Sequence, residues 1–160
     1  MLTSVFSNPV VVTAGAGREL WVGDSKYTLI VEGDATNGQF ALCDLNVTPG
    51  TGTPLHIHHT EDEMFYVLDG ELSITADGKK TLARPGTFAY VPKGTVHRWQ
   101  NESAGMVRFL CGVTPAGFEQ FFVAIGTPVD AANPTPPAVG PEFYENIARL
   151  APEFNMEVVG

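Results

Sequence analysis

The stretch GTGTPLHIHHTEDEMFYVLDG, residues 50–70, contains three of the four histidines of this 160-residue chain. His56 and His58 are two positions apart, so on a β-strand both imidazoles point to the same side of the sheet. Glu63 follows a short polar break and begins a second apolar run, which ends at an Asp-Gly turn sequence. The fourth histidine, His97, lies about forty residues further along. Two imidazoles and a carboxylate on neighbouring strands supply most of a metal site, so this stretch predicts a two-stranded metal-binding unit.

The composition fits one globular domain that is rich in turns. A chain of 160 residues can bury a full core, and 44% of these residues are hydrophobic and 17% are charged. The 17 glycines and 12 prolines indicate frequent turns, which favours an all-β fold. The formal net charge is -9, and the nine lysines and arginines are scattered along the chain. Nucleic acid and anionic membranes are therefore not expected as partners.

The cysteines and the N-terminal stretch bear on the cellular compartment. Cys43 and Cys111 lie within apolar runs without the spacing of a zinc site, so both are expected to be buried free thiols. The N-terminal stretch lacks the positive region of a secretory signal and is interrupted by Asn8 and Pro9. No run approaches the roughly 20 apolar residues that a membrane-spanning helix needs. We therefore expect a cytoplasmic protein with reduced thiols.

Short strands separated by turn residues fill most of the chain. Outside the histidine unit, strands are expected near residues 19–22, 27–32, 39–47, 71–75, 80–83, 87–92, 96–101 and 106–114. Turn sequences such as GDS, GDATNG and ADG lie between them, and no helical periodicity interrupts the series. The pattern is typical of an all-β protein.

The last quarter of the chain has a different pattern. Residues 115–126, PAGFEQFFVAIG, and residues 141–154, PEFYENIARLAPEF, have apolar side chains at helical spacing. The segment between them is rich in Pro, Ala and Asn and is expected to be a loop. About 45 residues are too few for an independent core, so we expect the two helices to pack on the outside of the sheet. The tail NMEVVG is expected to add an edge strand.

Two sequence patterns together resemble a known family. From Gly50 to Gly70 the chain reads G-x5-H-x-H-x4-E-x6-G, and from Gly86 to Asn101 it reads G-x5-P-x-G-x2-H-x3-N, with fifteen residues between them. Both patterns resemble the two motifs of the cupin superfamily at every defining position. Within that superfamily, the runs EDEMFYVLDGEL and TPAGFEQFF look like the small single-domain proteins grouped with quercetin dioxygenase. The resemblance covers residues from about 20 to 125.

The resemblance implies a cupin jelly-roll barrel, or double-stranded β-helix, that holds one divalent metal ion on His56, His58, Glu63 and His97. Strand periodicity agrees, because it turns both histidines of the first pair inward and places Glu63, Phe65 and Val67 on one face. The expected organisation is a single cupin domain over residues 1–160. Its barrel core spans about 20–114, and a C-terminal helical extension spans about 115–155.

The ligand set narrows the choice of metal. Three imidazoles and one carboxylate suit Fe, Mn, Ni, Cu or Zn better than Ca or Mg, which prefer oxygen ligands. Four protein ligands leave open positions for a substrate, water or dioxygen. The sequence leaves the identity of the metal open.

Aromatic residues near the motifs are candidates for the substrate pocket. Trp99 has the same inward parity as His97, and Trp99, Phe65 and Phe88 are the expected substrate-binding walls, although aromatic side chains in a small barrel are also ordinary core. Apolar walls would favour an aromatic or otherwise hydrophobic ligand.

Several polar residues of the motifs are not expected to bind the metal. His59 is adjacent to His58 and is therefore expected to point out of the barrel. Glu61 and Asp62 are excluded as ligands because strand parity or the break between the strands turns them away. Asn101 is expected to tie a loop through hydrogen bonds.

The outward face of the Glu63 strand is also apolar. Met64, Tyr66 and Leu68 would lie there, and either the C-terminal helices or a partner subunit must cover them. The resemblance implies a homodimer through such a face, and the residues alone would allow a monomer.

Three functions stay open at this stage. The resemblance favours a metal-dependent dioxygenase for a small aromatic or enediol-like substrate, in which Glu63 ligates the ion and accepts a proton as a catalytic residue. The second is a non-redox isomerase, epimerase or lyase for a sugar or keto acid, with the metal as Lewis acid and activity with Zn. The third is a binding module for a small molecule without catalysis.

Overall fold

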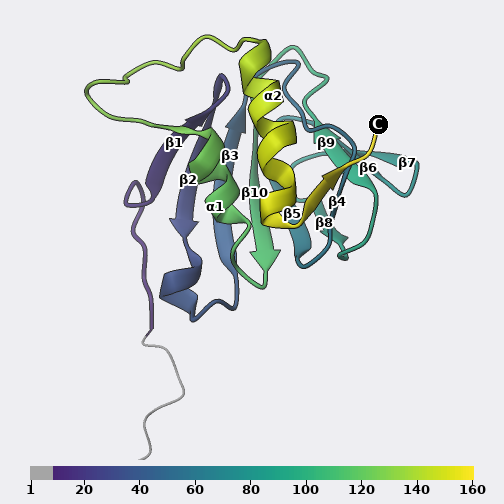
Figure 1. Cartoon of the computed structure of the whole chain (residues 1–160), viewed down its shortest axis with the longest axis horizontal. Helices are drawn as coiled ribbons and strands as arrows, with labels where there is room; N and C mark the ends of the chain where they lie inside the picture. Colours follow the sequence, from purple (N-terminus) through teal and green to yellow (C-terminus); the bar gives the residue numbers. More distant parts are fainter. Residues whose placement is uncertain (1–8) are drawn as a thin grey trace, which may run out of the picture.

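The computed structural model describes residues 9–160, whose strands form two antiparallel sheets (Figure 1). The larger sheet has the strand order β11-β1-β2-β3-β10-β5-β8. Its strands are β1 (Arg18–Val22), β2 (Ser25–Val31), β3 (Ala41–Val47), β5 (Asp62–Asp69), β8 (Phe88–Val91), β10 (Val107–Thr114) and β11 (Thr127–Pro128). The smaller sheet has the order β12-β4-β9-β6-β7. Its strands are β4 (His56–His58), β6 (Leu72–Ala76), β7 (Lys79–Ala83), β9 (His97–Gln100) and β12 (Met156–Val158).

The expected all-β class with two C-terminal helices is confirmed. Helix α1 (Glu119–Ile125) begins four residues later than the start of the expected helical segment, since Gly117 has a φ of 136° that no α-helix accommodates. Helix α2 (Pro141–Leu150) has a proline in its first turn, where the missing N–H costs no hydrogen bond. Two short 3₁₀ helices, η1 (Gly33–Thr36) and η2 (Ala151–Phe154), complete the structure. The tail forms the expected edge strand, because β12 pairs with β4.

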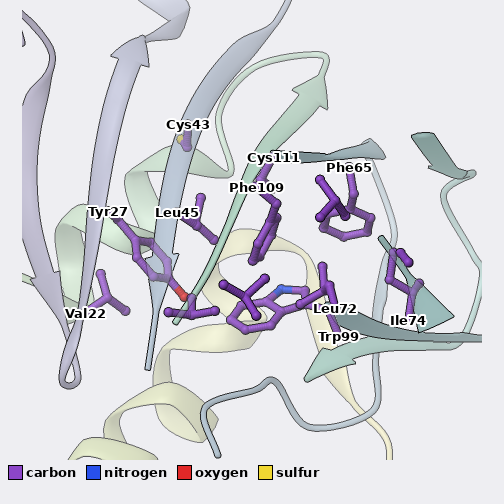
Figure 2. Packing of buried hydrophobic residues seen from close by; sticks show 14 of the residues in the cluster. Val22, Tyr27, Cys43, Leu45, Phe65, Leu72, Ile74, Trp99, Phe109 and Cys111 are labelled. Atoms are coloured by element: carbon purple, nitrogen blue, oxygen red, sulfur yellow. The ribbon is translucent and has the colours of Figure 1, made fainter. Parts of the chain in front are cut away.

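The hydrophobic core lies between the two sheets. In Figure 2, Phe109 of β10 lies next to Phe65 of β5 and Trp99 of β9, with ring centroids 6.0 Å and 5.1 Å away. All three side chains are at most 4% exposed. The strand parity expected for β5 is confirmed, because Glu63, Phe65 and Val67 are buried while Tyr66 and Leu68 are exposed.

The C-terminal helical segment packs on the sheet, as expected, and also contacts the histidine unit. Figure 1 shows α1 and α2 on the same side of the molecule, in front of β3 and β10. Phe118, just before α1, and Phe121 within it are 4% exposed, and Phe118 packs edge to face on His58 with centroids 4.2 Å apart. The helical segment therefore reaches the histidine unit of the barrel. Among residues 9–160, no helix is long and apolar enough to cross a membrane.

Two polar residues of the motifs have the structural roles expected of them. Asn101 is fully buried, and its amide nitrogen donates hydrogen bonds to the carbonyls of Val47 and Gly105. Its carbonyl accepts hydrogen bonds from the backbone N–H and hydroxyl of Ser103, so Asn101 ties this loop together. His59 points outward, with its side chain 50% exposed and Nε2 2.9 Å from the Glu157 carboxylate.

Candidate metal centre

The four expected ligands come together between the two sheets. His56 and His58 are on β4 and His97 is on β9, and the antiparallel register places His56 directly opposite His97. Cross-strand partners lie on the same face of a sheet, so both rings point inward. Glu63 is supplied by β5 of the other sheet. All four side chains are buried, and one ligand atom of each lies within 4.8 Å of the others. The cluster therefore bridges the two sheets inside the barrel.

Backbone carbonyls fix the orientation of two of the rings. Nδ1 of His56 lies 2.9 Å from the carbonyl oxygen of Pro54, and Nδ1 of His97 lies 2.9 Å from that of Thr95. A carbonyl oxygen can only accept, so each Nδ1 carries a proton and donates it. The Nε2 atom of each ring is thereby turned toward the centre of the cluster. This is the usual arrangement for a histidine that binds a metal through Nε2.

Glu63 is held through both of its oxygens. Oε2 lies 2.7 Å from Nε2 of His97 and 3.3 Å from Nε2 of His58. Oε1 accepts a hydrogen bond from the Cys111 thiol, with Sγ 3.2 Å away. Burial and the neighbouring carboxylate raise the pKa of this thiol well above its usual value, so the sulfur stays protonated and can donate. Cys111 therefore turns one oxygen of Glu63 away and leaves the other facing the histidines.

The protonation of the cluster follows from burial and from the one carboxylate within it. Burial lowers the pKa of His56 to about 4. Burial also lowers the pKa of His97, but the hydrogen bond and charge of Glu63 outweigh it and raise that pKa above its ordinary value. For Glu63, burial raises the pKa, but the facing imidazoles outweigh it and hold the pKa well below the ordinary value. Without metal, the centre is thus a buried ion pair of Glu63 and His97 beside a neutral His56.

These residues fit a divalent transition metal ion. Nε2 of His58 is fully buried and makes no geometrically sound hydrogen bond, although Oε2 of Glu63 lies 3.3 Å away. A ring nitrogen in this state loses its hydration and gains nothing in exchange unless a ligand binds there. Divalent transition metal ions bind a set of three imidazoles and one carboxylate more readily than Ca or Mg, which prefer oxygen ligands. His56, His58, Glu63 and His97 are therefore able to hold one ion together.

Metal binding should become stronger as the pH rises toward the raised pKa of His97. The ion needs the free electron pair of Nε2, so below that pKa each binding event must displace the proton shared with Glu63. We expect the affinity for Zn to rise about tenfold per pH unit while the pH is below the pKa of His97, and to level off above that pKa. Calorimetric titrations at pH 6 in two buffers with different ionisation enthalpies should report release of about one proton. Zinc binding without proton release at pH 6 would contradict the conclusion that His97 is protonated in the metal-free protein.

The cluster opens into a small cavity with apolar walls. The cavity has a volume of about 80 Å³, and both His56 and Glu63 reach it. Its apolar and aromatic lining comes from both sheets and from the C-terminal segment: Val22, Tyr27, Trp99, Phe118, Phe121, Phe122, Ile125, Phe143, Ile147 and Met156. Beyond Phe143 and Ile147 lies a wider groove of about 610 Å³, which these two side chains also line.

The three aromatic residues expected to form substrate walls lie in different places. Trp99 lines the cavity, whereas Phe65 belongs to the core between the sheets. Phe88 is 60% exposed, which corrects the expectation that it walls the pocket. The reason is the register of β8 on β5, which sets Phe88 opposite the outward-facing Tyr66.

Several residues of the site could not be found from the motifs. Tyr27 lines the cavity, and burial raises the pKa of its phenol, so its hydroxyl stays protonated and can donate. The alternation of Tyr27 and Leu29 with Lys26 and Thr28 is the sequence signal for its inward position, and the burial of β2 follows it. Phe118 and Cys111 reach the histidines and Glu63 only through the tertiary fold. Glu61 was excluded as a ligand, and the structure places it behind His58 as a buried residue, 6% exposed.

Comparison with known proteins agrees with this fold. The profile of the cupin domain matches residues 44–113. Quercetin 2,3-dioxygenase from Bacillus subtilis is 30% identical over 122 residues, which cover 76% of this chain and 36% of the relative. This chain therefore spans little more than a third of that protein's length.

Solved structures have the same architecture. A predicted oxalate decarboxylase from Thermotoga maritima superposes with a TM-score of 0.61 at 19% identity, covering 66% of this chain and 99% of the other. A sugar phosphate isomerase of the cupin superfamily from Silicibacter pomeroyi superposes with a TM-score of 0.50 at 27% identity, covering 57% and 59%. The profile match, the sequence relative and these folds together show that the chain belongs to the cupin superfamily, as a small cupin.

Proposed function

We propose that this protein is a metal-dependent dioxygenase that acts on a small aromatic or enediol-like organic substrate. The observation that carries the proposal is the joining of a buried three-histidine, one-glutamate cluster to a cavity lined by aromatic and apolar side chains. Such walls favour a flat, hydrophobic ligand, because aromatic and apolar side chains outnumber the polar ones, which are Tyr27, Thr51, Thr53, His56 and Glu63. The similarity to a quercetin 2,3-dioxygenase supports the same choice.

Each residue of the cavity has a proposed task. A divalent ion such as Fe, Mn, Ni or Cu would supply Lewis acidity and a one-electron route between substrate and dioxygen. Glu63 reaches the cavity as an ionised carboxylate, and its proposed task beside binding the ion is to accept the proton of a substrate hydroxyl. Tyr27 can donate a hydrogen bond to a substrate oxygen, and Trp99 offers its ring to an aromatic substrate.

The volumes of the cavity and the groove bear on how a substrate is held. A cavity of about 80 Å³ is smaller than the engineered cavity of about 150 Å³ that admits benzene. The outer groove, about 610 Å³, has the size of an ordinary ligand site. Phe143 and Ile147 of α2 line both spaces. We therefore propose that the substrate rests in the groove and reaches the metal centre when these two side chains move aside.

A non-redox reaction on a sugar or keto acid is the second candidate. It is favoured by the similarity to a sugar phosphate isomerase and by the polar side chains along the groove, among them Asp24, Arg98 and Gln100. These side chains line the outer groove and not the cavity that His56 and Glu63 reach. The walls nearest the metal ligands therefore support the dioxygenase.

Oxygen consumption separates the candidates. The protein is stripped of metal, reloaded separately with Fe, Mn, Ni, Co, Cu or Zn, and mixed with flavonols and single-ring enediol-type aromatics in an oxygen electrode. The dioxygenase predicts consumption of dioxygen with at least one redox-active ion and none with Zn. The isomerase predicts turnover of a sugar or keto acid with Zn and without dioxygen. Tight ligand binding with no turnover under any of these conditions would indicate a binding module.

Two further aspects of the protein remain predictions. A homodimer is supported by the apolar side chains exposed on the outer face of β5 and β8, namely Tyr66, Leu68, Phe88 and Tyr90. A second copy of the chain on this face would cover them. A cytoplasmic location is supported by the two buried free cysteines.

A further inference from the structure

A buried pair of polar groups beside the metal centre lacks hydrogen bonds. Within residues 9–160, the fully buried side-chain nitrogen and oxygen atoms without a hydrogen-bond partner are Nδ1 and Nε2 of His58 and Oε2 of Glu61. Nε2 of His58 is the atom that faces the metal site. Nδ1 is on the opposite side of the ring, and Oε2 of Glu61 lies 4.0 Å from it. The two remaining atoms therefore face each other across a gap that is too long for a hydrogen bond.

The other two histidines show what His58 lacks. In His56 and His97, Nδ1 donates to a backbone carbonyl at 2.9 Å, and this bond turns Nε2 toward the centre of the cluster. No carbonyl takes that place for His58. A histidine that binds metal almost always donates its other ring N–H to a carbonyl, a carboxylate or water. For His58 the group in position to accept is the carboxylate of Glu61.

We propose that Glu61 is a positioning residue of the metal centre. With an ion bound, its carboxylate accepts a hydrogen bond from Nδ1–H of His58 and fixes the tautomer in which Nε2 faces the ion. The inference rests on the metal site of the proposed function and not on the reaction carried out there. It gives a role to an acidic side chain that is 6% exposed, although carboxylates are rarely buried without a partner.

The surroundings of Glu61 allow the contact to form. Glu61 lies between β4 and β5 and belongs to neither strand, so its backbone is not held in a sheet. The ring of His58 packs against Phe118 at 4.2 Å, which limits its own movement. Shortening the gap from 4.0 Å to a hydrogen-bond length of about 2.9 Å takes a shift of only about 1 Å. We expect the carboxylate, and not the ring, to make most of that shift.

The charges also match. With an ion bound and both carboxylates ionised, Glu61 and Glu63 would together balance the charge of a divalent ion. In a buried site of low polarity, a second carboxylate behind a neutral ligand strengthens the attraction for the ion and the basicity of the imidazole.

The test compares three variants in the full chain. Glu61→Ala removes the acceptor, Glu61→Gln keeps an acceptor oxygen without the charge, and Asp62→Asn removes the adjacent charge as a control. Asp62 faces outward, where its oxygens accept hydrogen bonds from the Tyr90 hydroxyl and the Lys93 backbone N–H. Zinc affinity is measured by competition with a chromophoric chelator, and the His58 tautomer by ¹⁵N NMR of histidine-labelled, zinc-loaded protein.

We expect Glu61→Ala to bind zinc 10–100-fold more weakly, Glu61→Gln to lie between it and the wild type, and Asp62→Asn to bind as the wild type does. The Nδ1–H signal of His58 should move upfield in Glu61→Ala. The metal-free Glu61→Ala protein should melt no earlier than the wild type, because an unpartnered carboxylate is lost, whereas a purely structural role predicts an earlier transition.

Two results would overturn the proposal. One is a Glu61→Ala protein with unchanged zinc affinity and an unchanged Nδ1 signal. The other is a loss of zinc affinity that merely follows a lower melting temperature of the metal-free protein. A wild-type protein that binds no zinc, cobalt or manganese at all would instead refute the metal site itself, so the two failures are distinguishable.

Discussion

Replacing His58 by alanine should abolish stoichiometric metal binding while the barrel stays folded. One of four ligands is lost, so we expect the affinity for zinc or cobalt to fall by more than the 10–100-fold that is typical of losing an outer hydrogen-bond partner. The fold should persist because neither ring nitrogen of His58 has a hydrogen-bond partner in the metal-free protein. Elemental analysis of the purified protein, together with a cobalt titration followed by visible absorption, would measure the loss. Circular dichroism would check the fold.

The neighbouring histidine offers a matched control. His59 is adjacent in sequence, but its side chain is 50% exposed and pairs with Glu157 on the outside of the barrel. His59→Ala should therefore keep full metal content. Equal loss of metal in both variants would mean that the ion binds elsewhere. A His58→Ala protein that unfolds while still binding metal would show that the ligand assignment is wrong.

Replacing Phe109 by alanine should lower the free energy of unfolding by about 3–5 kcal/mol. The Phe109 side chain is fully buried between Phe65 and Trp99, so its removal leaves a cavity that the two sheets cannot close (Figure 2). Because Trp99 also lines the site, the change should additionally weaken the binding of any aromatic ligand. Urea denaturation of the metal-free protein measures the stability.

Phe88→Ala is the control for this change. Phe88 is 60% exposed, so its removal should alter the free energy of unfolding by at most about 0.5 kcal/mol. The comparison requires a protein concentration at which sedimentation velocity finds one species, since Phe88 lies on the face proposed for dimerisation. A large destabilisation by Phe88→Ala, together with a small one by Phe109→Ala, would contradict the assignment of Phe109 to the core and of Phe88 to the surface.

The motifs in the sequence were enough to predict the four candidate ligands, because the family resemblance implies them and local strand geometry agrees. A period of two residues turns His56 and His58 to one side, and Glu63 and Phe65 to another shared side, whatever the rest of the chain does. The same rule turned His59 outward, as the structure confirms. The two C-terminal helices were also predictable, since their apolar spacing is a local pattern.

The walls of the site depended on contacts between distant segments. Parity along β8 says that Phe88 and Tyr90 share a face, but only the pairing with β5 decides which face points inward. Tyr27, Cys111 and Phe118 approach the ligands from three separate parts of the chain. The spacing of residues in the sequence does not predict these contacts between distant segments.

Glu61 shows both what the sequence predicts and what only the tertiary structure decides. Its position in the break between two strands follows from the sequence, and on that ground it was set aside as a ligand. Its burial behind His58, with Oε2 4.0 Å from Nδ1 of that ring, follows only from the tertiary structure. The sequence by itself determined the superfamily, the strand parity and the four candidate ligands, because these follow from the two motifs and from the alternation of side chains along each strand. Only the tertiary structure decided the cavity walls and the partner of His58, because these depend on strand register and on helix packing between residues far apart in sequence.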